Sequence, residues 1–271
     1  VRNLMKKGFP VSIYTRTKSK VLDVIEEGAV WCDDVKTCVQ DKDVIITIVG
    51  YPKDVEEVYF GENGIIANAK PGAVLIDMTT TSPKLSERIY AEAKPRGISA
   101  LDAPVSGGDS GARNGTLSIM VGGDEKDFEE ALPLFECMGK NIVHMGPAGF
   151  GQHTKAANQI AVAGATAAYT EALVYAQKAG LEPEKMLTAI GAGAAGSWQL
   201  SNMAPRVLKG DLAPGFFVKH FIKDMKIIEE EAGKWGVELS MLDSVLKMYE
   251  EMSRMGLDND GTQALIKYYQ K

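Results

Sequence analysis

The sequence has few of the residues that bind metals or form disulfides. Its three cysteines form no CxxC pair, and its three histidines form no HxxxH or HExxH pattern. Zinc sites and disulfide frameworks need such spacings, so we expect no metal site. An odd number of cysteines, with no recognisable signal peptide, is typical of a reducing compartment and predicts a cytoplasmic protein.

The sequence also lacks an excess of positive charge and a long apolar run. The 30 Lys and Arg residues are outnumbered by 36 Asp and Glu residues, for a net charge of −6. This balance argues against a nucleic-acid backbone as the main partner. No segment approaches the roughly 18 apolar residues that a membrane-spanning helix needs. With 271 residues, 45% of them hydrophobic, the chain fits a globular protein of one or two domains.

The first half of the chain alternates short β-branched runs with amphipathic stretches. The runs predict strands at Val11–Tyr14, Val44–Val49, Val74–Met78, Ser99–Ala103, Leu117–Val121 and Asn141–His144. The amphipathic stretches predict helices near residues 18–27, 52–60, 83–94 and 125–138. Ser82 before Pro83 is a typical helix start. Residues 1–145 therefore predict a Rossmann-like α/β domain with a mostly parallel sheet covered on both faces.

The second half has a different pattern. From His153 to Lys178 only Gly164 interrupts a helical sequence, which predicts one helix of roughly 25 residues. The remainder is helical by pattern, with glycine-rich breaks near residues 191–196, 210–215 and 256–261. Residues 146–271 therefore predict an all-α domain, joined to the first domain by the long helix.

The N-terminus is unusual for such a domain. Val1–Lys7 resembles the end of a helix that stops at Gly8. A doubly wound dinucleotide domain begins one strand earlier, with a strand and a GxGxxG turn, and that element does not precede Val11. We expect the natural protein to carry it upstream, and we expect residues 1–7 to form a helix beside an incomplete sheet. The 271-residue chain alone should then bind a dinucleotide poorly.

A first candidate site is the segment Asp102–Gly108, which reads DAPVSGG and follows a predicted strand. Ligands of open α/β sheets bind beyond the carboxyl ends of the strands. The Ser106 hydroxyl and the accessible backbone N–H groups of Gly107 and Gly108 could together hold a carboxylate. The alternative is a tight structural loop.

A second candidate site lies where a glycine-rich segment leads into the long helix. Lys155, Asn158 and Gln159 have the i, i+3, i+4 spacing that places them on one helix face, among small alanines. A desolvated lysine can exchange protons near neutral pH. The alternative is a solvent-exposed lysine in the first turn of a helix.

Two further segments carry charge. Arg16, with Thr17 and Lys18, follows the first predicted strand, where an acid would hold the ribose of NAD and an arginine accepts the 2′-phosphate of NADP. No acid is present, so the segment favours NADP over NAD. The pair Lys223-Asp224 lies on a predicted helix of the second domain, and by itself it is more typical of a surface ion pair.

The order and spacing of these segments resemble the β-hydroxyacid dehydrogenase family, which includes 3-hydroxyisobutyrate dehydrogenase and the tartronate, glyoxylate and succinic semialdehyde reductases. The resemblance extends over essentially the whole chain. Four segments carry it: the DxPVSGG substrate loop at Asp102–Gly108, the GTLSIMVGG run at Gly115–Gly123, the GxGxxxK segment at Gly149–Lys155, and the Lys223-Asp224 pair.

The resemblance implies a function and a set of site residues. It implies an NAD(P)-dependent enzyme that interconverts a small 3-hydroxyacid and its semialdehyde, acts as a homodimer or homotetramer and has its active site between the two domains. Lys155 would be the general acid/base, Ser106, Gly107 and Gly108 would bind the substrate carboxylate, and Asn158 or Gln159 would hold the substrate. The implied cofactor contacts are Val49, Gly50, Thr80 and Lys223.

Three departures from the family pattern affect these assignments. The GxGxxG turn is missing, Gln159 stands where many members have a second asparagine, and Gly50-Tyr51-Pro52 replaces a commoner Leu-Pro-Asn. An imine reductase on the same fold is one alternative, although those enzymes usually lack the lysine. A non-catalytic dinucleotide-binding module is another, for which loss of the lysine would be the mark. The presence of Lys155 favours the dehydrogenase.

Overall fold

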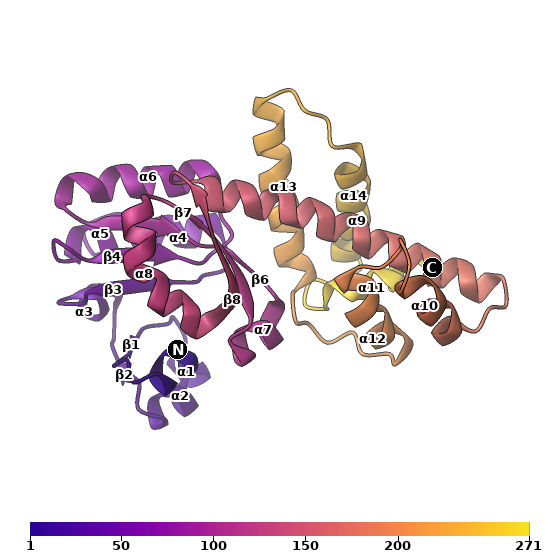
Figure 1. Ribbon diagram of the computed structural model, residues 1–271, viewed down its shortest axis with the longest axis horizontal. Helices are drawn as coiled ribbons and strands as arrows, with labels where there is room; N and C mark the ends of the chain where they lie inside the picture. Colours follow the sequence, from indigo (N-terminus) through magenta and orange to yellow (C-terminus); the bar gives the residue numbers. More distant parts are fainter. Residues whose placement is uncertain (271) are drawn as a thin grey trace. The chain divides into compact units, whose positions relative to one another are not determined.

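The structure is a computed structural model that describes residues 1–270. It divides into two compact units (Figure 1), of which the first is Val1–Lys155 and the second begins at Ala156. The long helix α9 (Phe150–Lys178) contributes to both.

The main sheet of the first unit has six strands (Figure 1). Strands β3 (Val44–Thr47), β4 (Val74–Asp77) and β5 (Ser99–Asp102) pair in parallel. Strand β7 (Leu117–Gly122) runs antiparallel to β5 and to the short β6 (Val105–Ser106), and pairs in parallel with β8 (Gly139–Gly146). The predicted strands in this region are confirmed, with ends displaced by one or two residues.

Apolar side chains alternate along the strands and form a core on each face of the sheet. Leu75 packs with Val55 and Tyr59 on one face, whereas its neighbour Ile76 packs with Phe135 on the other. Successive residues of a strand point to opposite faces. The prediction that helices cover both faces is therefore confirmed.

The helices of this unit agree with the amphipathic pattern where they are long. Between residues 35 and 138 they are α3 (Val35–Val39), α4 (Pro52–Tyr59), α5 (Ile65–Asn68), α6 (Pro83–Ala93), the 3-10 helix η2 (Lys94–Arg96), α7 (Gly108–Asn114) and α8 (Glu125–Met138). The Ser82 hydroxyl accepts a 3.2 Å hydrogen bond from the Leu85 N–H, so this N-cap is confirmed. The short helices α3, α5 and α7 were not predicted, since each has too few residues to show a period.

The N-terminal segment forms a small sheet of its own. Helix α1 (Arg2–Lys6) confirms the predicted helix over residues 1–7. It is followed by β1 (Ser12–Ile13), the 3-10 helix η1 (Lys18–Lys20), α2 (Leu22–Glu26) and β2 (Val30–Trp31). Strand β1 pairs in parallel with β2, and within residues 1–270 no strand pairing joins these two to the main sheet (Figure 1). Strand β2, at two residues, was not predicted.

The second unit is helical. After α9 come α10 (Pro183–Gly191), α11 (Trp198–Asn202), α12 (Ala204–Leu208), α13 (Val218–Lys234), α14 (Ser240–Arg254) and the 3-10 helix η3 (Thr262–Gln270). Phe221, Met225, Leu242 and Tyr249 are at the centre of its core. The predicted long helix is confirmed, but it begins three residues earlier, at Phe150. No helix formed by the described residues is both long and apolar enough to span a membrane.

Candidate active site

The DAPVSGG segment is more regular than the loop predicted from the sequence. Val105 and Ser106 form β6 and pair with Ile119 and Ser118, and α7 begins at Gly108. Gly107 and Gly108 have φ angles of 127° and 63°, in the left-handed region that favours glycine. Ser106 and Gly107 are half-buried and Gly108 is exposed. A hydroxyl and the backbone N–H groups of two glycines thus lie together in sequence and structure, as a carboxylate would need.

Lys155 is a buried side chain. It lies in the second turn of α9 with only 6% of its surface exposed, and its Nζ donates a 2.7 Å hydrogen bond to the Val105 carbonyl. The alternative of a solvent-exposed lysine is therefore wrong. The Val105 carbonyl precedes Ser106 by one residue, so the amine and the Ser106–Gly108 segment lie at one place in the first unit.

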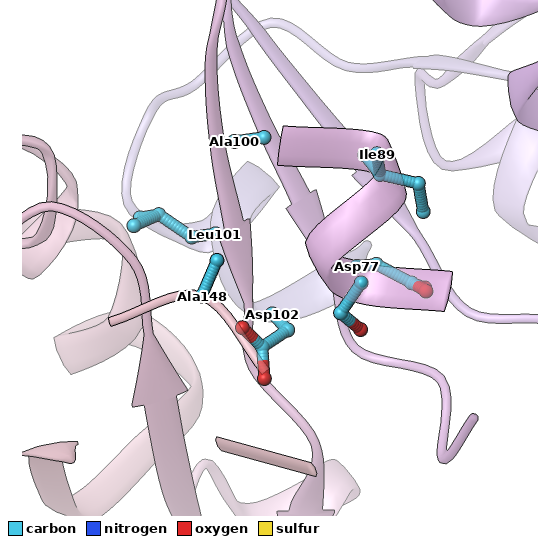
Figure 2. A pocket seen from close by; sticks show the side chains of 7 residues that line it. Asp77, Ile89, Ala100, Leu101, Asp102 and Ala148 are labelled. Atoms are coloured by element: carbon cyan, nitrogen blue, oxygen red, sulfur yellow. The ribbon is translucent and has the colours of Figure 1, made fainter. Parts of the chain in front are cut away.

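Two aspartates end adjacent strands of the main sheet. Asp77 of β4 and Asp102 of β5 are partners in register. With Ser86, Ile89 and Ala148 among others, they line a small cavity, and Figure 2 shows the side chains of both aspartates there. Sequence reasoning gave neither carboxylate a role. The available signal was an aspartate at the end of each of two consecutive predicted strands.

The two carboxylates have different surroundings. Burial raises the pKa of Asp77 to about 6, although its Oδ1 accepts hydrogen bonds from Thr47 Oγ1 at 2.9 Å and from the Thr79 N–H at 3.1 Å. Burial also raises the pKa of Asp102, but N–H groups of Gly149 and Gln152 oppose that shift. Both oxygens of Asp102 accept hydrogen bonds, whereas Asp77 Oδ2 has no partner among the described residues.

The residues predicted to meet the adenosine end of a dinucleotide follow β1. Thr17 is exposed, and the Arg16 side chain is 67% exposed. Arg16 Nη1 lies 3.1 Å from Oδ1 of Asp54, whose side chain is only 6% exposed. The other oxygen of Asp54 accepts a 3.0 Å hydrogen bond from the Tyr51 N–H at the start of α4. Arg16 is thus anchored at one nitrogen while most of its guanidinium faces solvent, which suits a phosphate.

The second group of predicted cofactor contacts follows β3 and β4, whose ends are adjacent in register. The Val49 N–H donates a 2.9 Å hydrogen bond to Thr79 Oγ1, which ties the loop of Val49 and Gly50 to the loop of Thr80. Val49 could therefore meet a dinucleotide through its carbonyl or side chain, since its N–H is already used. Thr80, the residue after Thr79, is half-buried. These loops lie at the carboxyl ends of parallel strands, where such ligands bind.

One glycine motif is present in the second unit without the context it needs. Gly191, Gly193 and Gly196 match GxGxxG, but Gly191 is the last residue of helix α10, so a helix and not a strand leads into the motif. A dinucleotide turn requires a preceding strand. A Cβ at Gly196 would lie 2.6 Å from the Gly191 carbonyl oxygen, so close backbone approach explains that glycine.

In the second unit, a line of polar contacts joins the two amides to the Lys-Asp pair. Asn158 Nδ2 donates to Gln159 Oε1 and Gln159 Nε2 donates to Asp224 Oδ2, both at 2.7 Å. Lys223 Nζ lies 2.8 Å from Asp224 Oδ1 and forms an ion pair with it, but the angles between the two groups are not those of a hydrogen bond. The side chains of Lys223 and Asp224 are only 12% and 2% exposed. The interpretation as a surface ion pair is therefore wrong.

The geometry can be compared with known proteins. A family model described as the NAD binding domain of 6-phosphogluconate dehydrogenase matches residues 1–146. A second, described as "NAD-binding of NADP-dependent 3-hydroxyisobutyrate dehydrogenase", matches residues 149–269. A probable 3-hydroxyisobutyrate dehydrogenase-like protein of Arabidopsis thaliana mitochondria is 43% identical over 97% of this chain and 79% of its own length. The chain belongs to the 3-hydroxyisobutyrate dehydrogenase family.

Two further similarities extend the agreement. An uncharacterized oxidoreductase of Bacillus subtilis is 55% identical over 99% of this chain and 93% of its own length. The solved structure of Mycobacterium tuberculosis 3-hydroxyisobutyrate dehydrogenase with L-serine has a TM-score of 0.89 at 27% identity, covering 99% of this chain and 94% of that one. The predicted family and fold are confirmed. The protein is an NAD(P)-dependent oxidoreductase with a Rossmann-like domain followed by a helical domain.

Proposed function

We propose that the protein interconverts a small 3-hydroxyacid and its semialdehyde, prefers NADP, and uses Lys155 as the general acid/base. The observation that carries this proposal is the position of the Lys155 amine. It is buried, 2.7 Å from the Val105 carbonyl, next to the Ser106–Gly108 segment that would hold a carboxylate. A proton-exchanging group and an anion-binding segment are the two parts that a hydroxyacid dehydrogenase needs.

The substrate carboxylate would be bound by the Ser106 hydroxyl and by the backbone N–H groups of Gly107 and Gly108. Both glycines have positive φ angles, and successive residues in such turn conformations can form an anion-binding concavity with their N–H groups. These groups are attached to β6 and to the start of α7. A site on such elements holds its ligand in one orientation, so the hydroxyl carbon of a short acid would be presented to Lys155.

The chemistry assigned to the chain is a proton transfer. The nicotinamide, when bound, supplies the hydride acceptor in one direction and the hydride donor in the other. In oxidation, the neutral Lys155 amine takes the hydroxyl proton as the substrate loses hydride from the same carbon. In reduction, the Lys155 ammonium returns that proton to the carbonyl oxygen. The Val105 carbonyl accepts a hydrogen bond from the amine in either charge state and fixes its direction.

Of the two amides, we assign substrate contact to Asn158. Gln159 is 3% exposed, and both ends of its amide are used, one by Asn158 and one by Asp224. Asn158 is half-buried, lies one turn after Lys155 on the same helix, and uses one N–H toward Gln159. Gln159 would orient Asn158, and Lys223, paired to Asp224, would be the cofactor contact that the family resemblance implies.

The preference for NADP rests on the surroundings of Arg16. Its guanidinium is anchored by the buried Asp54, and Thr17 and Lys18 follow it with no acid in the predicted ribose-binding position. An anchored arginine loses less conformational freedom when it binds a phosphate. The residues present therefore fit the 2′-phosphate end of NADP, and Val49, Gly50 and Thr80 would be further contacts of the dinucleotide.

The test is a substrate panel with the full-length protein. Three- and four-carbon semialdehydes and β-hydroxyacids, including the L-serine that accompanies the Mycobacterium tuberculosis enzyme, would be assayed with NADH and NADPH. We expect turnover of at least one semialdehyde with NADPH, and light scattering should show a homodimer or homotetramer. Turnover of cyclic imines alone would indicate an imine reductase, and dinucleotide binding without any turnover would indicate a non-catalytic module.

A further inference from the structure

The Asp102 carboxylate is bound by the start of the helix that carries Lys155. Asp102 ends β5 and is 4% exposed. Its Oδ1 accepts a 2.7 Å hydrogen bond from the Gly149 N–H, and its Oδ2 accepts a 2.9 Å hydrogen bond from the Gln152 N–H. An ionised carboxylate can accept at both oxygens, and it is favoured at a helix N-terminus. Asp102 therefore fixes both the position and the direction of the first turn of α9.

Two glycines make room for this carboxylate. A Cβ at Gly122 would lie 2.5 Å from Asp102 Oδ1, and a Cβ at Gly151 would lie 2.7 Å from Asp102 Oδ2. Neither distance is compatible with a real side chain, so the carboxylate fits only because both positions are glycine. The carboxylate is thus packed against the sheet at Gly122 and against the helix at Gly151.

Gln152 provides a second link between the helix and the sheet. Its Nε2 donates a 2.8 Å hydrogen bond to the Thr79 carbonyl, and its Oε1 accepts a 3.0 Å hydrogen bond from the Thr81 N–H. The loop after β4 is thus joined to the residue whose N–H binds Asp102. Lys155 lies three residues farther along the helix, and its amine returns to Val105, three residues after Asp102.

We propose that Asp102 is a positioning residue for Lys155, assisted by Gln152. The segment Asp102–Val105 holds the helix at one end and the lysine amine at the other, so Lys155 Nζ keeps a fixed place beside Ser106–Gly108. This proposal rests on the proposed function, in which Lys155 transfers the proton. Displacing a catalytic group by about 1 Å can slow a reaction by about 100-fold, so the fixed distance has a measurable consequence.

Replacement of Asp102 by asparagine tests the link at constant size. An asparagine offers one acceptor oxygen and one NH₂ group, so it can satisfy only one of the two N–H groups of the helix. The first turn of α9 should shift, and Lys155 with it. The single-turnover rate of hydride transfer should fall by about 10- to 100-fold, while the affinity for NADPH, measured by fluorescence, stays within about threefold of the original.

A double-mutant cycle separates positioning from a general structural role. The four proteins are the unmodified chain, Asp102→Asn, Lys155→Met and the double variant, each assayed at high enzyme concentration. If Asp102 acts through Lys155, Asp102→Asn should slow the Lys155→Met protein by less than about threefold. An equal fold-loss in both backgrounds would overturn the proposal. Asp41→Asn, at an exposed aspartate, controls for the loss of one negative charge.

The same cycle distinguishes failure of this proposal from failure of the proposed function. If Lys155→Met retains most of the activity, the lysine is not the acid/base and the proposed function is wrong. If Lys155→Met is strongly impaired but the effects of the two changes multiply, only the role of Asp102 is wrong. Should Asp102→Asn not fold, Gln152→Met removes the two side-chain links to Thr79 and Thr81. A second double-mutant cycle then combines Gln152→Met with Lys155→Met. If the fold-losses of the two changes simply multiply, the proposal is overturned.

Discussion

Gln159 donates a 2.7 Å hydrogen bond from Nε2 to Oδ2 of Asp224, a carboxylate with 2% of its side chain exposed. The same amide accepts from Asn158 through Oε1. Its two ends thus connect a buried charge to a half-buried amide that is one helical turn from Lys155. The geometry gives Gln159 a supporting position and leaves Asn158 to meet a substrate.

The first prediction compares these two amides. Gln159→Met keeps the length of the side chain but leaves Asp224 Oδ2 without its donor, so the free energy of unfolding should fall by about 1–3 kcal/mol. Asn158→Ala should cost less stability, because Asn158 is only half-buried, and should lower kcat/KM for the substrate more. Urea unfolding and steady-state kinetics measure both effects. A larger kinetic loss in Gln159→Met than in Asn158→Ala would reverse the assignment.

The second prediction concerns Lys155. Lys155→Met should lower kcat by about 10²–10⁴-fold, the usual size of a general acid/base contribution. The affinity for NADPH should be nearly unchanged. Lys140→Met is a matched control, since Lys140 is exposed on β8, and it should retain full activity. A Lys155→Met protein with most of its activity would show that another group transfers the proton.

The third prediction concerns the choice of cofactor. The unmodified protein should have a higher kcat/KM for NADPH than for NADH, and Arg16→Asp should erase or reverse that preference. Asp54→Asn should weaken it, because Arg16 loses the buried anchor 3.1 Å away. Lys20→Asp changes the charge as much as Arg16→Asp at an exposed nearby position, so it controls for long-range electrostatics. A preference of the unmodified protein for NADH would falsify the role given to Arg16.

The long elements of the fold could be predicted from the sequence because their patterns repeat. The apolar runs at β3, β4 and β5 and the uninterrupted helix α9 each extend far enough to show a period. The two-residue strands β2 and β6 do not. A two-residue strand exists because a neighbouring strand pairs with it, and that partner is distant in the sequence.

The candidate site could be predicted only in part for the same reason. Lys155 and the Ser106–Gly108 segment carry recognisable motifs, so their residues were found. The hydrogen bond that brings Lys155 next to this segment is made to the Val105 carbonyl, and no sequence motif indicates a backbone acceptor. The hydrogen bonds to Asp224 and to Asp102 join residues that are 47 or more positions apart in the sequence. The burial of the Lys223-Asp224 pair and the place of Gln152 depend on such long-range contacts. Such contacts cannot be predicted from short sequence patterns.

The last prediction concerns Asp77, the buried aspartate at the end of β4. Burial raises the pKa of Asp77 from 3.8 to about 6, so the folded protein binds this proton more tightly than the unfolded chain does. The resulting stabilisation is fully present below about pH 4 and is lost as the pH rises through about 6, a change of about 3 kcal/mol at most. An asparagine at this position stays neutral at every pH. Its Oδ1 can still accept from Thr47 and Thr79.

Asp77→Asn should therefore become more stable relative to the unmodified protein as the pH rises. Near pH 4 the two proteins should unfold at similar urea concentrations, because a protonated aspartate and an asparagine are both neutral. Near pH 8 the unmodified protein has a buried carboxylate whose Oδ2 has no partner among the described residues, so the variant should gain up to about 3 kcal/mol. Asp41→Asn, an exposed position, should show no such trend. The contradicting result is a stability difference between Asp77→Asn and the unmodified protein that stays constant from pH 4 to 8. It would mean that Asp77 does not titrate in this range, because a hydrogen-bond donor other than Thr47 and Thr79 offsets the burial of its carboxylate.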